Sequence, residues 1–362
     1  MVFLVVVGLR FAVPLFIPRW PLPAIVTALV LDGIDQSVFQ WFGYDPPGYQ
    51  GYDKAMDMFY LSVAYLSVLR NWTSRPALEV ARFLFFYRLA GVVLFELLDS
   101  RAILMIFPNT FEYFFIAYEI VRLGWDPARV GRRRWVITAA CIWIFVKLPQ
   151  EWWIHVAQLD FTDEVAAHSW ILPVLALVAV VAGVWAWFWL RPRLPGRSWS
   201  WHVEAGPLPA EIDTTPERDA WIAAHGRVLS AATLEKVVLI GLLCLIYGQV
   251  LPERRSSDLE LVVGIAAFVV VNVAITLAVA RRAGTRDSTL GAFGARVVLN
   301  AGLVLVAWWL VRQAGGDLNP WIALFFLLLI SLLITLDDRF RPVAEVRAHA
   351  ARAAAAVTPA AS

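Results

Sequence analysis

Cysteine and charged residues are scarce in this sequence, and both shortages exclude whole classes of protein. The 362 residues include two cysteines, Cys141 and Cys244, both in apolar segments, which excludes a disulfide framework and a CxxC motif. Charged residues make up only 17% of the chain, whereas hydrophobic residues make up 60% and the mean hydropathy is +0.66. This composition excludes a soluble globular protein, in which about a quarter of the residues are charged.

A strong excess of charge of either sign is also missing, and so is abundant lysine. The net charge of +2 gives no indication of a nucleic-acid partner. Lysine occurs only at Lys54, Lys147 and Lys236, while arginine and alanine are frequent. This bias is typical of a GC-rich bacterial genome. We therefore expect a bacterial membrane protein whose main partner is the lipid bilayer.

Long apolar segments recur along almost the whole chain. A bilayer core of about 30 Å requires about 20 apolar residues of helix per crossing. Candidate spans lie at residues 2–19, 21–41, 54–71, 77–99, 101–122, 135–156, 168–190, 233–251, 259–280, 290–312 and 319–336. We predict an all-α, polytopic transmembrane helix bundle with about 11 spans and no sizeable soluble domain. The first span lacks a charged start and a cleavage site, so we interpret it as retained helix, although residues 1–41 could also form a re-entrant pair.

Arginine clusters fall on alternate connections between the predicted spans, which orients the bundle. These clusters lie near residues 70–82, 129–134, 191–197 and 281–286. By the positive-inside rule, these connections are cytoplasmic. With an odd number of spans, the N-terminus is then outside and the C-terminus is in the cytoplasm of a bacterial plasma membrane.

The sequence divides into regions that differ in composition. The predicted regions are 1–166 (six helices with clustered charges and an aromatic outer loop), 167–190 (a seventh helix), 191–232 (a cytoplasmic linker with a short helix), 233–337 (four membrane helices) and 338–362 (a cytoplasmic tail, partly disordered). No convincing internal repeat occurs, which weakens the interpretation as an inverted-repeat transporter.

Carboxylates lie at unusual depth within the predicted spans of the first region. A charged residue at the centre of a membrane helix costs about 2.5–3.5 kcal/mol on insertion scales. Such residues therefore usually form ion pairs or take part in the function of the protein. The candidates for a catalytic role are Asp32, Asp35, Asp53, Asp57, Glu96 and Asp99. All six lie toward the predicted outer ends of their spans, so we expect them to converge at one depth.

The outer connection between the second and third spans is rich in turn formers and aromatic rings. The candidate substrate-binding rings are Trp41, Tyr44, Tyr49 and Tyr52. Rings stack on the apolar C–H faces of sugars, and neighbouring carboxylates can accept hydroxyl hydrogen bonds, so we expect a lipid-linked substrate at this loop. The alternative is an aromatic belt that anchors the interface.

Polar residues recur every four positions along the sixth span. Lys147, Glu151 and His155 line one helix face and are further candidates for ligand binding, as is Asn109 in the fifth span. A plain charge ladder is the alternative for the three. His155 and His168, with the acids between them, could also hold a divalent cation, the only cofactor that the sequence indicates.

Two structural ion pairs are expected between the fourth and fifth spans. These spans form an antiparallel hairpin, in which residues whose numbers sum to about 200 lie at equal depth. Arg88 then faces Glu112, and Arg82 faces Glu119. Opposite charges at equal depth would let both helices insert, although the two arginines do not share a helix face.

The spacing of four carboxylates resembles that of a known family. CDP-alcohol phosphotransferases carry four aspartates in the pattern D-x2-D-G-x2-A-R followed by G-x3-D-x3-D. The matching residues here are Asp32, Asp35, Asp53 and Asp57, and the family's Gly, Ala, Arg and second Gly are replaced by Gln36, Phe39, Gln40 and Tyr49. The resemblance is limited to this motif. It implies a nucleotide-linked lipid substrate at the cytoplasmic face, whereas the arginine distribution places the loop outside.

Three functions of different class are compatible with this sequence. We expect an integral membrane enzyme that acts on a lipid-linked cell-envelope precursor at the outer face, with an acid as base or metal ligand. One alternative is a proton- or ion-coupled transporter that uses the buried charges of Arg88, Glu112, Glu119 and Lys147. The other is a non-catalytic subunit of an envelope complex that binds membrane-protein partners.

Overall fold

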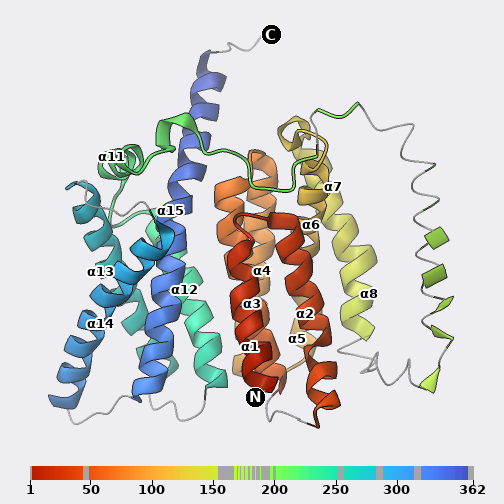
Figure 1. Ribbon diagram of the computed structural model, residues 1–362, viewed down its shortest axis with the longest axis horizontal. Coiled ribbons are helices and arrows are strands. Elements are labelled where there is room, and N and C mark those ends of the chain that lie inside the picture. The colour runs from red at the N-terminus through yellow and green to blue at the C-terminus, as the bar shows by residue number, and fades with distance from the viewer. Residues whose placement is uncertain are drawn as a thin grey trace.

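The protein is described by a computed structural model that covers residues 2–43, 49–153, 201–251, 257–282, 288–313 and 319–357, with isolated positions between 167 and 198. Every regular element in these ranges is a helix (Figure 1). The prediction of an all-α protein is therefore confirmed.

The N-terminal helices form one side of the molecule (Figure 1). They are α1 (Val2–Ala12), η1 (Val13–Phe16), α2 (Pro21–Trp41), α3 (Tyr49–Asn71), α4 (Arg75–Leu98), α5 (Ala102–Ile106), α6 (Thr110–Arg122), η2 (Pro127–Arg129), α7 (Arg132–Ile142), the π-helical η3 (Trp143–Lys147) and α8 (Leu148–Glu151). Prolines stand in the first turns of η1, α2 and α4, where the missing N–H costs no helical hydrogen bond.

The C-terminal helices form the other side. They are η6 (Ala210–Ile212), α11 (Thr215–His225), α12 (Ala231–Val250), α13 (Asp258–Ala280), α14 (Thr289–Gln313) and α15 (Pro320–Val357). A capping box of Thr214 and Glu217 begins α11, and one of Ser257 and Glu260 begins α13.

Helix α3 lies between the two sides and is almost entirely buried. It packs against α4, α12 and α15, and every residue from Ala55 to Leu69 is buried. Because these neighbours surround α3 with protein, its polar residues can find protein partners instead of facing hydrocarbon. Helix α3 is therefore the element on which buried polar groups from both sides can meet.

Five of the described helices are long and apolar enough to cross a membrane. They are Pro21–Trp41, Ala231–Val250, Asp258–Ala280, Thr289–Val306 and Pro320–Ala353. This set supports a membrane protein. The larger number of about 11 spans stays a prediction, and the span expected at 168–190 lies largely outside the described residues.

The helices run between two ends of the molecule that differ in charge. At the arginine-rich end, which is uppermost in Figure 1, α3 ends, α4 and α7 begin, and α11 lies. Arg70 lies at that end of α3, Arg75 and Arg132 are the first residues of α4 and α7, and Arg347 contacts the carbonyl of Arg70. At the opposite end α2 ends, α3 begins and α4 ends. This opposite end is called the acidic end below, because the intramembrane aspartates lie near it.

The span predicted at 101–122 is wrong as a continuous helix. Helix α5 ends at Ile106, and α6 begins only at Thr110. Pro108 lies between them, and proline both lacks an N–H donor and disfavours helix in the preceding residue. This break changes the depth of α6 relative to α4.

Helix α15 extends past the predicted end of the last membrane span at residue 336. It continues through Pro342 to Val357. Val343 and Val346 in this extension are buried against Ile212 of η6. The extension is therefore held by packing at the arginine-rich end.

Gly91 on α4 permits the closest approach between α4 and the segment that follows α5. A Cβ atom added at Gly91 would lie 2.1 Å from the Cβ of Phe107. We expect Gly91→Ala to lower the free energy of unfolding by about 1–3 kcal/mol, because the backbone must move apart. Thermal unfolding in detergent would measure the loss. Gly264→Ala on α13, where a Cβ atom would have nothing within 4 Å, should be neutral or stabilising. An equal change in stability for the two variants would contradict the close contact between Gly91 and Phe107.

Candidate functional site

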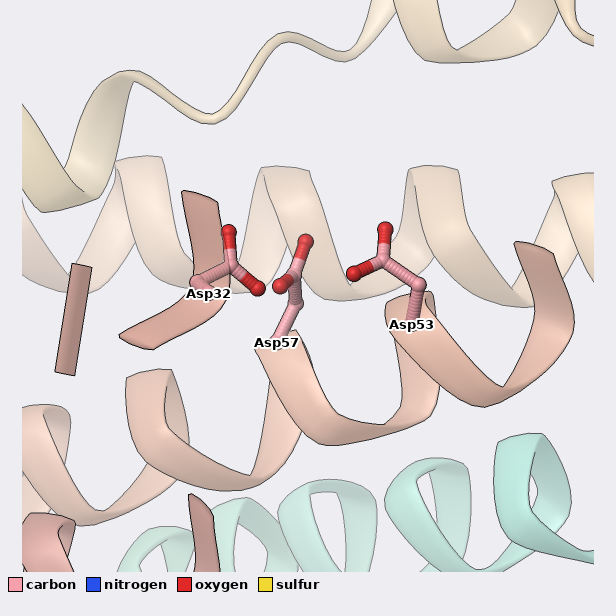
Figure 2. Close-up of side chains that lie close together, drawn as sticks. All are labelled: Asp32, Asp53 and Asp57. Atoms are coloured by element: carbon pink, nitrogen blue, oxygen red, sulfur yellow. The ribbon is translucent and has the colours of Figure 1, made fainter. Parts of the chain in front are cut away.

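Four aspartates from α2 and α3 surround the guanidinium of Arg10 near the acidic end. Asp32 and Asp35 lie one turn apart on α2, and Asp53 and Asp57 lie one turn apart on α3. Figure 2 shows Asp32, Asp53 and Asp57 with their carboxylates directed into one region between these helices. The convergence predicted for these four residues is confirmed.

Arg10 on α1 contacts all four carboxylates. Its Nη1 donates to Asp35 and lies 3.3 Å from Asp53 Oδ1. Its Nη2 donates to Asp32 and lies 3.2 Å from Asp57 Oδ1. Arg10 is only 4% exposed and Asp35 only 1%. The guanidinium thus joins three helices through one buried group, which its planar fork of donors allows.

Lys54 and two tyrosines complete this cluster. Lys54 Nζ lies 2.6 Å from Asp53 and 3.5 Å from Asp57. The hydroxyl of Tyr49 donates to Asp35 at 2.5 Å, and the ring of Tyr52 lies 5.6 Å from the Arg10 guanidinium carbon. Two of the predicted substrate-binding rings therefore contact the cluster. We call Arg10, the four aspartates and Lys54 the Arg10 cluster.

The Arg10 cluster has more carboxylates than cations. Four aspartates face Arg10 and Lys54, so two negative charges lack a cation when all the aspartates are ionised. Buried charge is costly unless it is paired. The cluster therefore favours binding of a further positive charge, either protons or a metal cation.

Three of the aspartates are suited to hold a divalent cation. One oxygen of each of Asp32, Asp53 and Asp57 lies within 4.8 Å of the others. An ion at the Ca²⁺–oxygen distance of about 2.3–2.6 Å reaches oxygens at that separation, whereas Mg²⁺ at about 2.1 Å would draw them closer together. Carboxylate oxygens are the ligands that both ions prefer. The residues present thus fit such an ion in donor type and spacing, with Arg10 as a competing cation.

Glu96 and Asp99 differ in their relation to this cluster. Glu96 lies near α3, because a Cβ added at Gly51 would be 3.6 Å from its Oε2. Among the described residues, its buried Oε1 has no hydrogen-bond partner. Asp99 is exposed and ends α4 in the left-handed region with φ 47°, a conformation that aspartate tolerates. Glu96 is therefore a further candidate, while Asp99 forms the helix C-cap.

A second buried polar group lies deeper along α3. Tyr60, at the middle of α3, donates to Glu112 at 2.5 Å. Asn109 donates to Glu112 through its side chain at 3.0 Å and to Glu151 through its backbone N–H at 3.3 Å. Lys147 Nζ lies 3.8 Å from Glu151. Asn109, Lys147 and Glu151, predicted as ligand-binding residues, therefore share one network with Glu112.

The two predicted ion pairs across the α4–α6 hairpin are wrong. Arg88 instead donates to the carbonyl of Phe107 at 2.9 Å. Arg82 lies 3.4 Å from Glu235 of α12. Glu119 accepts from Arg122 at 2.6 Å and from the indole of Trp72 at 2.9 Å. The break at Pro108 removes the continuous hairpin on which the pairing by depth relied.

Of the remaining candidates for ligand binding, only Trp41 lies in the part of the chain that the structure describes, and it is 81% exposed. Tyr44 and His155 lie outside the described residues, as do the acids between His155 and His168. The proposed histidine metal site is therefore not tested.

Sequence reasoning missed Arg10, although a signal was present. It is the one charged residue between Met1 and Pro18, and an isolated arginine in an apolar segment usually has a buried partner. It also missed a cluster in the C-terminal half, because its residues had been interpreted as the ends of spans.

This second cluster joins α12, α14 and α15. Lys236 contacts Asp337 at 2.9 Å and also contacts Asp338. Arg296 contacts Asp338 at 2.6 Å, and Arg341 contacts Asp337 at 2.7 Å. Arg341 also reaches Glu235 at 3.2 Å, and Glu235 is the carboxylate that Arg82 of α4 contacts. Four cations therefore face three carboxylates. Because every carboxylate of this cluster has at least one cation, the cluster is explained by helix association alone, in contrast to the Arg10 cluster.

Comparisons with known proteins place the chain in no family. No family model, curated protein or solved structure matches it. The spacing shared with CDP-alcohol phosphotransferases therefore stays limited to the four aspartates.

Removing Arg10 should destabilise the protein strongly. Arg10→Met leaves two buried aspartates, Asp35 and Asp57, and two half-buried ones, Asp32 and Asp53, with Lys54 alone. Loss of one partner from a buried charge cluster costs about 3–5 kcal/mol. Adding Asp35→Asn should restore part of the loss, because one of the repelling charges is removed. Chemical unfolding in detergent would measure both effects. Arg19→Met, at an exposed position near the other end, is the control; equal losses for Arg10→Met and Arg19→Met would contradict the cluster.

Proposed function

We propose that this protein is an integral membrane enzyme that uses the Arg10 cluster to act on a lipid-linked cell-envelope precursor at the outer face of a bacterial plasma membrane. The observation that carries the proposal is the convergence of four aspartates on one buried arginine and one lysine. This cluster has two more carboxylates than cations, and such an excess of negative charge is the property that a site for a metal cation requires.

The depth of the cluster favours a substrate that is anchored in the membrane. Asp35 lies six residues before the end of α2 and Asp53 four residues after the start of α3, which is about 6–9 Å along the helices at 1.5 Å per residue. A group at that depth lies beneath the headgroup region of the nearer leaflet. A lipid-linked headgroup can reach this level without leaving the bilayer.

Each residue of the cluster has a chemical part in this proposal. Asp32, Asp53 and Asp57 would hold a divalent cation, which when bound supplies a Lewis acid that polarises a phosphoryl oxygen. Arg10 orients the carboxylates, and Tyr49 holds Asp35 through its 2.5 Å hydrogen bond. Glu96, whose buried Oε1 has no hydrogen-bond partner in the part of the chain that the structure describes, is the candidate to accept a proton from the attacking group.

The distribution of arginine supports the proposed orientation. Arg70, Arg75 and Arg132 lie at the end opposite to the Arg10 cluster. The positive-inside rule assigns an arginine-rich end to the cytoplasm, so the cluster would face outward.

A divalent cation should stabilise the wild-type protein through this cluster. A ligand at 100 times its dissociation constant adds about 2.7 kcal/mol to the free energy of unfolding. We expect Mg²⁺, Mn²⁺ or Ca²⁺ to raise the unfolding temperature of the wild type relative to EDTA, and to have no such effect on Asp57→Asn. Asp99→Asn is the matched control, because this substitution at the C-cap of α4 also removes one carboxylate charge at the acidic end. A wild type indifferent to all three ions would contradict the metal site.

Function itself is tested in a deletion strain. We expect the strain to accumulate a lipid-linked envelope precursor, and the wild-type gene and Asp99→Asn to restore the normal lipid profile. Asp57→Asn should fail to restore it at equal protein level. Full restoration by Asp57→Asn would overturn the proposal, and loss only through reduced protein level would favour a non-catalytic subunit.

A proton- or ion-coupled transporter is the second candidate, and one observation favours it. Asp53, Asp57 and Tyr60 follow one face of α3, and Tyr60 donates to Glu112 at the middle of that helix. Polar groups thus extend from the acidic end to the middle of α3, where transporters place their sites.

Glu112→Gln distinguishes the two candidates. Glutamine keeps the size of the side chain and can still bond Tyr60 and Asn109, but it cannot carry a proton or a charge. The enzyme proposal expects the variant to restore the lipid profile of the deletion strain almost fully. A transporter would instead lose most proton or cation flux in proteoliposomes, as measured with a pH-sensitive or ion-sensitive dye. Asp99→Asn serves again as the control for flux.

A further inference from the structure

A cavity of about 520 Å³ lies at the arginine-rich end, far from the Arg10 cluster. It is lined by the end of α3, the start of α4, α11, the start of α12 and the extension of α15. Its volume falls in the range of about 300–1,000 Å³ that is usual for ligand sites. We call it the arginine cavity.

Positive charge exceeds negative charge in the arginine cavity. Five arginines and three glutamates line it, with two histidines, His225 and His349. Arg75 pairs with Glu79 at 3.1 Å, and Arg82 and Arg341 share Glu235 at 3.4 and 3.2 Å. These pairs account for two of the glutamates and three of the arginines.

The two remaining arginines contact no carboxylate within the described residues. Arg347 donates through Nη1 to the backbone carbonyls of Arg70 and Trp72, at 2.6 and 3.3 Å. Those bonds fix its guanidinium at the end of α3 and leave its other N–H donors available. Arg352 lies five residues further along α15 and is exposed. The cavity therefore presents fixed donors for an anion, the arrangement with which arginine binds phosphate.

Trp221 adds a donor without an acceptor. It lines the cavity and stacks on His225 with ring centroids 3.9 Å apart. Its buried Nε1 has no hydrogen-bond partner within the described part of the chain. A buried donor of this kind costs about 1–3 kcal/mol when unpaired, so an acceptor atom that reaches this N–H would be stabilised there.

A shallow, open groove on α4 alone continues from the cavity. Glu79 and Arg82 line both, and the groove then follows Phe83, Phe86 and Tyr87. Phe83 is 58% exposed. These aromatic residues lie roughly 12–18 Å along α4 from Arg75, which is the depth of acyl chains beneath a headgroup.

We propose that the arginine cavity and this groove bind one anionic phospholipid from the leaflet at the arginine-rich end. The phosphate lies between Arg347, Arg82 and Trp221, and one acyl chain lies along Phe83 and Tyr87. The excess positive charge selects an anionic headgroup, and the continuous groove selects a lipid over a soluble phosphate. The proposal is independent of any reaction at the Arg10 cluster.

Native mass spectrometry of the full chain in mild detergent tests this proposal, with phosphatidylglycerol and phosphatidylcholine as probes. Wild type should retain phosphatidylglycerol at least tenfold better. Each arginine near a membrane surface contributes a factor of about five to anionic lipid binding, so Arg352→Gln should lose about fivefold and Arg347→Gln with Arg352→Gln about 25-fold. Arg133→Gln, an exposed arginine at the same end but outside the cavity, is the matched control.

Three results would overturn the proposal. Equal retention of the two lipids by wild type would remove the headgroup selectivity, and an equal loss in Arg133→Gln would show general surface attraction. Displacement of phosphatidylglycerol by millimolar glycerol phosphate would assign the cavity to a soluble phosphate. Arg352→Gln removes no contact with a described residue and should fold normally. This variant therefore tests the proposal even if variants of Arg347 fail to fold. Phe83→Ala should weaken binding of both lipids if the groove holds an acyl chain.

Discussion

The cost of burying charge among apolar helices is the constraint on which the rest of this structure depends. A single unpaired charge costs more than most individual packing contacts contribute. Several buried charges are therefore matched by a partner from another helix, as Arg10 of α1 is by aspartates of α2 and α3. The charged residues thus determine which helices lie side by side, and the apolar residues fill the space between them.

Helix α3 shows how this constraint organises the molecule. It is surrounded by α4, α12 and α15, and it contributes Asp53, Asp57 and Tyr60 to polar groups at successive depths. Near its other end, Tyr65 donates to Glu235 of α12. A helix with so many polar contacts is stable only where protein surrounds it, so α3 is central although it falls outside the set of helices apolar enough to cross a membrane alone.

The balance of charge separates the two buried clusters. Around Lys236, four cations including Arg82 face three carboxylates, each carboxylate has a cation, and helix association accounts for the arrangement. Around Arg10, four aspartates face two cations, and the structure accepts a surplus of negative charge at one end of the bundle. The arginine cavity at the other end carries the opposite surplus. Uncompensated charge at both ends is the feature that helix association does not explain.

The sequence by itself determined the helical class, most helix boundaries and the convergence of Asp32, Asp35, Asp53 and Asp57. Those results follow from local causes: apolar length, proline position and the i,i+3 or i,i+4 spacing that puts two side chains on one helix face. Only the tertiary structure decided the partners. Arg82 contacts Glu235 rather than Glu119, and Arg10 lies among the aspartates. Spacing along one helix fixes a direction and a depth, but a partner depends on which helices pack together, and that depends on contacts across the whole bundle.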